Sequence, residues 1–131
     1  MANEETLHSI GIDGSMACIG IAGISNTGKL FLKGNIKGSN KLSGMNRMQV
    51  IFRNFYAEME DFMTPQYWAS LESVSVESPV VGRKNPQTAI KLATITGMLA
   101  GYFVFKKPTI KVYNPNFAEI KTFYGFPSIS N

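Results

Sequence analysis

The sequence is poor in the residues that build disulfide frameworks and histidine-based active sites. It contains a single cysteine, Cys18, and a single histidine, His8. One cysteine cannot form an internal disulfide and nothing argues for an oxidising compartment, so we expect a cytoplasmic protein. Cys18 lies in an apolar run and is expected to be a small buried hydrophobe. No catalytic serine or cysteine arrangement surrounds His8, which we expect in the core or at a strand edge.

Long apolar runs and a targeting signal are also missing. The chain opens with MANEETLHSIG, which lacks a basic region followed by an apolar segment, so we expect no signal peptide. No apolar run is long enough to cross a bilayer, so no membrane partner is expected. Charged residues number only 13 basic and 9 acidic, which gives a net charge of +4. This modestly basic balance permits an acidic partner such as nucleic acid, but many basic domains bind none.

Three antiparallel strands are predicted in the first part of the chain. Residues 8–13 and 17–24 are extended apolar runs separated by a Gly-Ser turn. Residues 29–36 follow the turn motif SNTG. Extended runs joined by short turns of this kind are typical of an antiparallel meander.

A long helix is predicted next, over residues 42–62. Its apolar side chains advance by three and four residues, which indicates one helical face packed against a sheet. Ser39 or Asn40 is expected to cap the helix, and the motif TPQ is expected to end it. The predicted apolar face consists of Leu42, Met45, Met48, Phe52, Phe55, Met59 and Phe62.

The remaining pattern alternates strand and helix. Residues 69–77 predict a fourth strand, and Asn85 followed by Pro86 predicts the start of a second helix that runs to about residue 105. Residues 109–113 predict a fifth strand, after which a short helix begins. Small residues recur in the second helix at intervals of three and four, which allows close approach either to the sheet or to a second subunit. These residues are Ala89, Ala93, Gly97, Ala100 and Gly101.

This order of elements predicts one α/β domain over residues 1–131. Its length suits a single domain, and its 44% hydrophobic content is sufficient for a core. Three antiparallel strands followed by strands that return through helical crossovers make a five-stranded mixed sheet flanked by helices. This is the ribonuclease-H-like arrangement. An actin-type or sugar-kinase half-domain has a similar order, so architecture alone does not decide the function.

Two carboxylates are the candidate site. Asp13 ends the first predicted strand and Glu77 ends the fourth, and these strands are expected to be neighbours at the centre of the sheet. Two adjacent carboxylates repel unless a cation lies between them, and a hard divalent ion such as magnesium is the natural partner. Taken alone, Asp13 could simply begin the Asp-Gly-Ser turn and Glu77 could be a solvated strand end.

Three motifs resemble the RuvC family of Holliday junction resolvases. The stretch IGIDGSMACIGIAGI is similar to the family's opening strand, which carries its first catalytic aspartate. The stretch VESPVVGRKNPQTAIKLATITGML resembles the second motif, in which a glutamate closes a strand before a basic loop and a helix. The stretch YNPNFAEIKTFYG is similar to the Tyr-x-Pro segment. The resemblance extends from residue 10 to residue 125.

The resemblance implies a homodimer that uses magnesium or manganese to hydrolyse phosphodiesters at four-way DNA junctions. Asp13 and Glu77 would then be the catalytic metal ligands. A basic residue near the cleaved strand and a basic loop after the glutamate would contact the DNA backbone. The residues expected to contact DNA are Arg83, Lys84, Asn85 and Lys121.

The chain also departs from the family pattern. The family completes its site with one or two acids on a C-terminal helix, which we expect this chain to lack because it ends with GFPSISN. Val80, Val81 and Gly82 stand where members often carry a base-stacking aromatic residue, and the segment before Lys121 is longer than usual. A short, diverged chain of this kind suits a phage-encoded member.

Three functions therefore remain open on the sequence. The first is a structure-selective endonuclease that cuts Holliday junctions or other branched DNA. The second is a branched-DNA-binding module of the same fold without catalysis, which the missing C-terminal acids favour. The third is a nucleotide-binding or phosphotransfer domain, against which the absence of a second glycine-rich phosphate loop counts.

Overall fold

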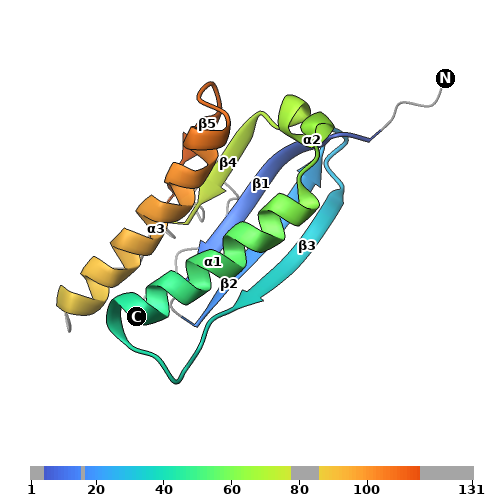
Figure 1. Ribbon diagram of the computed structural model, residues 1–131. Helices are drawn as coiled ribbons and strands as arrows, with labels where there is room; N and C mark the ends of the chain where they lie inside the picture. The colour runs from blue at the N-terminus through green and yellow to red at the C-terminus, as the bar shows by residue number, and fades with distance from the viewer. Residues whose placement is uncertain (1–4, 16, 78–85, 116–131) are drawn as a thin grey trace, which may run out of the picture.

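Five strands form one sheet in the computed structural model, which describes residues 5–15, 17–77 and 86–115 (Figure 1). The first three strands are antiparallel neighbours, joined by short turns. Their bounds confirm the predicted meander, because each end lies within one residue of its expected place. The strands are β1 (Leu7–Gly14), β2 (Cys18–Ser25) and β3 (Leu30–Lys37).

Parallel strands complete the sheet on the other side of β1. Strand β4 (Ser73–Val76) pairs in parallel with β1, and β5 (Lys111–Tyr113) pairs in parallel with β4. The order across the sheet is β3-β2-β1-β4-β5. Parallel neighbours need a crossover connection, which the helices α1 (Gly44–Phe62) and α3 (Pro86–Lys106) provide. The predicted five-stranded mixed sheet is therefore confirmed.

The segment between α1 and β4 differs from the prediction. Residues 69–72 were expected to be strand, but Pro65–Ser70 form a short helix, α2. Thr64 caps this helix, since its hydroxyl oxygen accepts a hydrogen bond from the backbone N–H of Tyr67 at 3.1 Å. Proline is favoured in the first helical turn, because its missing N–H has no helical partner there. The TPQ motif thus ends one helix and begins the next.

The start of α1 also differs from the prediction. Its N-cap residue is Ser43, so neither Ser39 nor Asn40 caps it, and Leu42 lies before the helix and is exposed. Met45 is 71% exposed, so the predicted apolar face is wrong in its first turn. The centre of the face is confirmed, because Met48, Phe55 and Met59 are buried together with Ile51.

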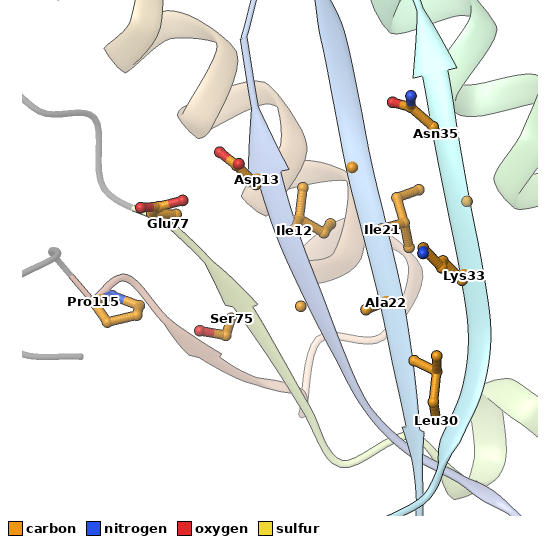
Figure 2. Close-up of a pocket in the computed structure, with 13 residues that line it drawn as sticks. Ile12, Asp13, Ile21, Ala22, Leu30, Lys33, Asn35, Ser75, Glu77 and Pro115 are labelled. Carbon is orange, nitrogen blue, oxygen red and sulfur yellow. The ribbon is translucent and has the colours of Figure 1, made fainter. Parts of the chain in front are cut away.

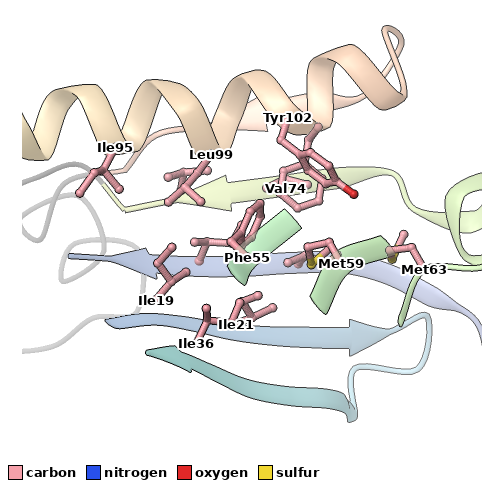
Figure 3. Close-up of a cluster of buried hydrophobic side chains, with 14 of the residues drawn as sticks. Ile19, Ile21, Ile36, Phe55, Met59, Met63, Val74, Ile95, Leu99 and Tyr102 are labelled. Carbon is pink, nitrogen blue, oxygen red and sulfur yellow. The ribbon is translucent and has the colours of Figure 1, made fainter. Parts of the chain in front are cut away.

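All of the long-helix packing lies on one face of the sheet. Both α1 and α3 cover this face, and Phe55 lies at the centre of the core they form with the strands (Figure 3). Its ring makes edge contacts with Tyr102 at 5.3 Å and Phe103 at 6.2 Å between ring centroids. Aromatic pairs at these separations add to the stability that burial supplies. The opposite face of the sheet is not covered by any helix of the described residues (Figure 1).

The end of α3 is tied to α2 by one lysine. The ammonium group of Lys107 donates hydrogen bonds to the carbonyls of Trp68, Ala69 and Leu71, at 2.8, 3.2 and 2.6 Å. These carbonyls lie at the C-terminal end of α2, where the helix offers them no partners of its own. Lys107 thereby holds the chain in place just before it enters β4.

Replacing this lysine should weaken the fold. We expect Lys107→Met to lower the free energy of unfolding by about 1.5–3 kcal/mol, because it removes hydrogen bonds from a charged donor. Lys29→Met is the matched control: Lys29 is exposed and pairs with Glu5 at 3.7 Å, and such pairs contribute at most about 1 kcal/mol. Urea denaturation measures both changes, and equal effects would show that the Lys107 contacts add nothing specific.

Candidate functional site

The two candidate carboxylates come together where β1 and β4 end. The parallel register pairs Ile12 with Val76, and the backbone N–H of Glu77 donates to the carbonyl of Ile12 at 2.9 Å. Asp13 and Glu77 are each the next residue along their strand. Their side chains therefore leave the sheet at the same end, and Figure 2 shows the two carboxyl groups beside one another.

The pair is electrostatically unfavourable as it stands. Partial burial raises the pKa of Glu77 above its ordinary value, and a hydrogen bond with Asp13 and the negative charge of Asp13 raise that pKa further. A raised pKa means that the surroundings disfavour the ionised form of Glu77. A cation placed between the two carboxylates would reverse this, because an opposite charge favours ionisation.

Asp13 does not begin the turn after β1, because it lies inside this strand and pairs with Gly20 on β2. The hydroxyl oxygen of Ser15 accepts hydrogen bonds from the backbone N–H groups of Ala17 and Cys18, at 3.3 and 3.1 Å. The same hydroxyl donates to the carbonyl of Cys18 at 2.9 Å. Because Ser15 makes these turn contacts, the interpretation of Asp13 as a simple turn residue loses its main support.

An open cavity of about 630 Å³ extends from the carboxylates across the face of the sheet that no helix of residues 5–15, 17–77 and 86–115 covers (Figure 2). Its floor is made of backbone and small side chains from the central strands. Lys33 and Asn35 border it on β3, on the far side from Glu77. The lining residues are Gly11, Ile12, Asp13, Gly20, Ile21, Ala22, Leu30, Lys33, Gly34, Asn35, Ser75, Glu77 and Pro115.

Asp13 and Glu77 are the described residues that could hold a divalent metal ion. No group of three or more histidine, cysteine, aspartate or glutamate side chains gathers anywhere in residues 5–15, 17–77 and 86–115. Two carboxylates nevertheless fit magnesium, which usually keeps several of its water ligands and binds proteins through one or two carboxylates. The donor set is thus suited to a hard, hydrated cation.

The other predicted site residues lie outside the described residues. This applies to Arg83, Lys84, Asn85 and Lys121, so the predicted basic contacts to DNA stay predictions. Sequence reasoning missed the residues that line the cavity on β3. The alternation of side chains along that strand could have placed Lys33 and Asn35 on one face, but only the register across β2 brings that face to the carboxylates.

Neither the histidine nor the cysteine is fully buried. His8 is not in the core: it is exposed at the second position of the central strand β1, with its Nδ1 atom 4.0 Å from a carboxylate oxygen of Glu72. Cys18 is only half-buried, at the first position of β2. Both lie where side chains still reach solvent, which periodicity alone does not reveal.

No helix among the described residues is long and apolar enough to span a membrane.

Two solved structures of RuvC from Thermus thermophilus resemble this fold. RuvC in complex with a Holliday junction substrate matches with a TM-score of 0.68 and 18% identity, over 95% of this chain and 73% of that one. A second RuvC structure matches with a TM-score of 0.61 and 19% identity, over 87% of this chain and 66% of that one. No protein-family model and no curated protein matches the sequence. The likeness shows the RuvC-type, ribonuclease-H-like fold.

The raised pKa of Glu77 predicts a pH-dependent stability. Above the ordinary value of 4.5, the unfolded chain releases a proton that the folded, metal-free protein still holds on Glu77. Stability from this group is therefore lost as the pH rises through the raised pKa. We expect the free energy of unfolding of Glu77→Gln, relative to the original protein, to increase over this pH range.

The cause of this effect can be tested in a second background. In Asp13→Asn the neighbouring charge is gone, so the pH dependence of the Glu77→Gln effect should shrink. Chemical denaturation at a series of pH values measures all four proteins. If the difference in free energy of unfolding between Glu77→Gln and the original protein does not change with pH, this result would contradict the interaction between the two carboxyls.

Proposed function

We propose that this chain is a divalent-metal-dependent endonuclease that nicks DNA at Holliday junctions or other branched DNA. The observation that carries the proposal is the juxtaposition of Asp13 and Glu77 at the ends of two central strands of a RuvC-type fold. One of the similar structures is RuvC bound to a Holliday junction substrate, which supports branched DNA as the substrate class.

The two carboxylates supply the metal-binding part of the mechanism. Asp13 and Glu77 would hold magnesium or manganese through their oxygens, and their strands fix both side chains at the same end of the sheet. When bound, the metal neutralises charge at a phosphodiester and lowers the pKa of a water that can attack it. Among the described residues, an open cavity lies beside the carboxylates, which is where the DNA backbone would reach them.

Basic residues supply the DNA-binding part of the proposal. The net charge of +4 favours binding to the DNA backbone, and each neutralised phosphate makes affinity more dependent on salt. We assign backbone contacts to Arg83 and Lys84, with Asn85 beside them, and a contact near the cleaved strand to Lys121. These assignments rest on the resemblance of the motifs. A phage-encoded origin likewise rests on that resemblance alone.

A homodimer belongs to the same proposal. Three of the small residues of α3 face away from the sheet, since Ala93, Gly97 and Gly101 are exposed, whereas Ala100 packs against the core. A side-chain carbon added at Gly97 or Gly101 would meet no atom within 4 Å, so packing inside this chain does not require glycine there. Exposed Ile90 and Val104 flank this stripe. A second copy docked here would pair two active sites by two-fold symmetry, as symmetric nicking of a junction requires.

The dimer can be tested on α3. Gly97→Arg places a long charged side chain on the exposed stripe without a clash inside the chain, so we expect a folded monomer. Sedimentation velocity measures the assembly state, and Lys91→Arg, which keeps the charge at another exposed position of α3, is the control. A Gly97→Arg protein that sediments like the original would contradict this interface.

A non-catalytic DNA-binding module is the alternative function. It is favoured by the finding that only two carboxylates, Asp13 and Glu77, gather in the part of the chain that the structure describes. Such a module would bind a four-way junction and leave it intact with every divalent metal. Cleavage in magnesium separates the two functions.

The catalytic assignment is tested by removing each carboxylate. We expect Asp13→Asn and Glu77→Gln each to slow magnesium-dependent nicking of a synthetic four-way junction by more than about 100-fold. Changes in the second shell of a metal site already cost about 10- to 100-fold. Junction binding should survive in both variants, because neither residue is a cation.

Glu72→Gln is the matched control for this experiment. It makes the same chemical change just before the other end of β4, where Glu72 is exposed and away from the cavity. It should cut at the original rate. Normal nicking by both Asp13→Asn and Glu77→Gln would show that the carboxylate pair is not the catalytic site.

A further inference from the structure

A second cavity lies where β1 ends, between the turn that follows this strand and the helices α1 and α3. Its volume is about 410 Å³, and it is lined by residues of the turn, of the start of α1 and of the N-terminal half of α3. The turn contributes Ser15, which follows Asp13 by two residues and so lies within about 7 Å of it along the backbone. The cavity is therefore close to the candidate metal site.

Two cationic side chains line this cavity. Arg47 comes from α1 and Lys91 from α3, so the fold brings together two positive charges that lie far apart in the sequence. Neither side chain forms an ion pair with any residue of 5–15, 17–77 and 86–115. Like charges at one site disfavour one another, and an anion between them removes that cost.

Arg47 also has a hydrogen-bond donor that lacks an acceptor. Its Nη2 atom donates to the amide oxygen of Asn40 at 3.4 Å, whereas its Nε atom is buried and has no partner among the described residues. A buried donor that is left unsatisfied is unfavourable, and more so when it belongs to a charged group. A guanidinium presents its donors as a planar fork that matches the oxygens of a carboxylate or a phosphate. The unmet donor thus indicates an oxyanion beside Arg47.

The start of α1 adds backbone donors at the same cavity. The first N–H groups of a helix have no partners within it, and the side chain of the N-cap residue Ser43 makes no capping hydrogen bond. The dipole of this 19-residue helix also favours a negative group at its N-terminus. Because Ser43 and Gly44 line the cavity, these backbone donors lie beside the two cations.

Few groups of this chain could supply the anion. None of the residues that line the cavity is acidic, and of the nine acidic residues in the sequence only Glu4 and Glu119 lie outside the described residues. A phosphate group suits the donors, because arginine binds its oxygens through two parallel hydrogen bonds and lysine is a common phosphate ligand.

We propose that this cavity binds a phosphate group, and that its occupant during catalysis is a backbone phosphate of the DNA that is cut at Asp13 and Glu77. Arg47 donates to the phosphate oxygens and Lys91 neutralises their charge. The cavity then holds the same DNA molecule beside the metal site. This inference rests on the proposed nuclease function, but the binding of phosphate can be measured without DNA.

The first test uses inorganic phosphate and the DNA-free protein. The backbone amide NMR signals of Gly44 and Met45 should shift as phosphate replaces chloride at constant ionic strength, and the shift should saturate. The double variant Arg47→Met, Lys91→Met should lose the saturable shift. Lys29→Met, which removes a charge at the opposite end of the sheet, is the control and should titrate like the original. The same curve for all three proteins would contradict the site.

A second measurement separates a ligand-binding role of Arg47 from a structural one. Arg47→Met removes a buried donor without a partner, so its thermal midpoint in phosphate-free buffer should equal or exceed that of the original. Phosphate should raise the midpoint of the original protein more, because a ligand of the folded state stabilises it and the general effect of the salt is common to both. A lower midpoint for Arg47→Met with an equal response to phosphate would make Arg47 structural and overturn the inference.

The assignment to DNA is tested by the salt dependence of junction binding. Binding is measured in the Asp13→Asn background, so that cleavage does not interfere. Adding Lys91→Met should reduce the slope of the logarithm of affinity against the logarithm of salt concentration by about one, because one phosphate contact is lost. Lys29→Met should leave the slope unchanged. An unchanged slope for both Lys91→Met and Arg47→Met would show that DNA does not occupy the cavity.

Glu4→Gln and Glu119→Gln test whether the chain itself fills the cavity. We expect both variants to titrate with inorganic phosphate as the original protein does. If the original protein shows no saturable shift and one of these variants does, a carboxylate of the chain is the occupant and the inference is wrong.

The remaining outcomes separate this inference from the proposed function. If the original protein nicks junctions in magnesium but the cavity binds no phosphate, the inference is wrong and the nuclease proposal stands. If the cavity binds phosphate but the protein neither binds nor nicks a junction, the proposed function fails and the assignment to DNA fails with it. Saturable phosphate binding together with a smaller salt slope for Lys91→Met supports both.

Discussion

The parallel pairing of β1 with β4 is the interaction on which the candidate site depends. It joins two segments that lie more than sixty residues apart in the sequence. The hydrogen bond from the backbone N–H of Glu77 to the carbonyl of Ile12 fixes the register of β4 against β1. A slip of one residue would send Glu77 to the other face of the sheet. The pairing thus fixes both the distance between the carboxylates and the side on which they lie.

The buried face of the sheet makes this register robust. Ile10, Ile12, Val74 and Val76 all point into the core beneath α1 and α3, and each is almost completely buried. Moving β4 by one residue would expose its valines and bury Ser73 and Ser75, so the hydrophobic effect opposes the slip. This packing also determines which side chains lie on the opposite face of the sheet. Side chains that alternate with the core residues are the ones that line the cavity.

Local patterns along the chain were sufficient for much of the fold. The hairpins around the Gly-Ser and SNTG turns were predicted within one residue, because turn chemistry and strand alternation act over short distances. The helix at 65–70 was missed, since the proline that ends α1 also suits the first turn of α2. Met45 and Leu42 continue the apolar periodicity of α1 beyond the sheet that would bury them, and no local pattern shows where a tertiary contact stops.

The residues of the candidate site also fall into those that the sequence could predict and those that it could not. Asp13 was recognisable as a carboxylate in an apolar strand, and Glu77 followed from the expected neighbours of that strand. Lys33 and Asn35 were not recognisable, because their place beside the carboxylates depends on two successive cross-strand registers, β1 with β2 and β2 with β3. A contrast between Gly14 and Gly20 is likewise invisible in the sequence. A side-chain carbon added at Gly14 would come within 2.8 Å of a core leucine, whereas at Gly20 its nearest neighbour would be at 3.9 Å.

The central claim is that Asp13 and Glu77 form a binding site for a divalent cation. It is tested most directly by titrating the purified, DNA-free protein with Mn²⁺ and following the free ion by electron paramagnetic resonance. The account predicts a saturable site in the original protein and in Glu72→Gln that is lost in both Asp13→Asn and Glu77→Gln. Equal Mn²⁺ binding by all four proteins would contradict it.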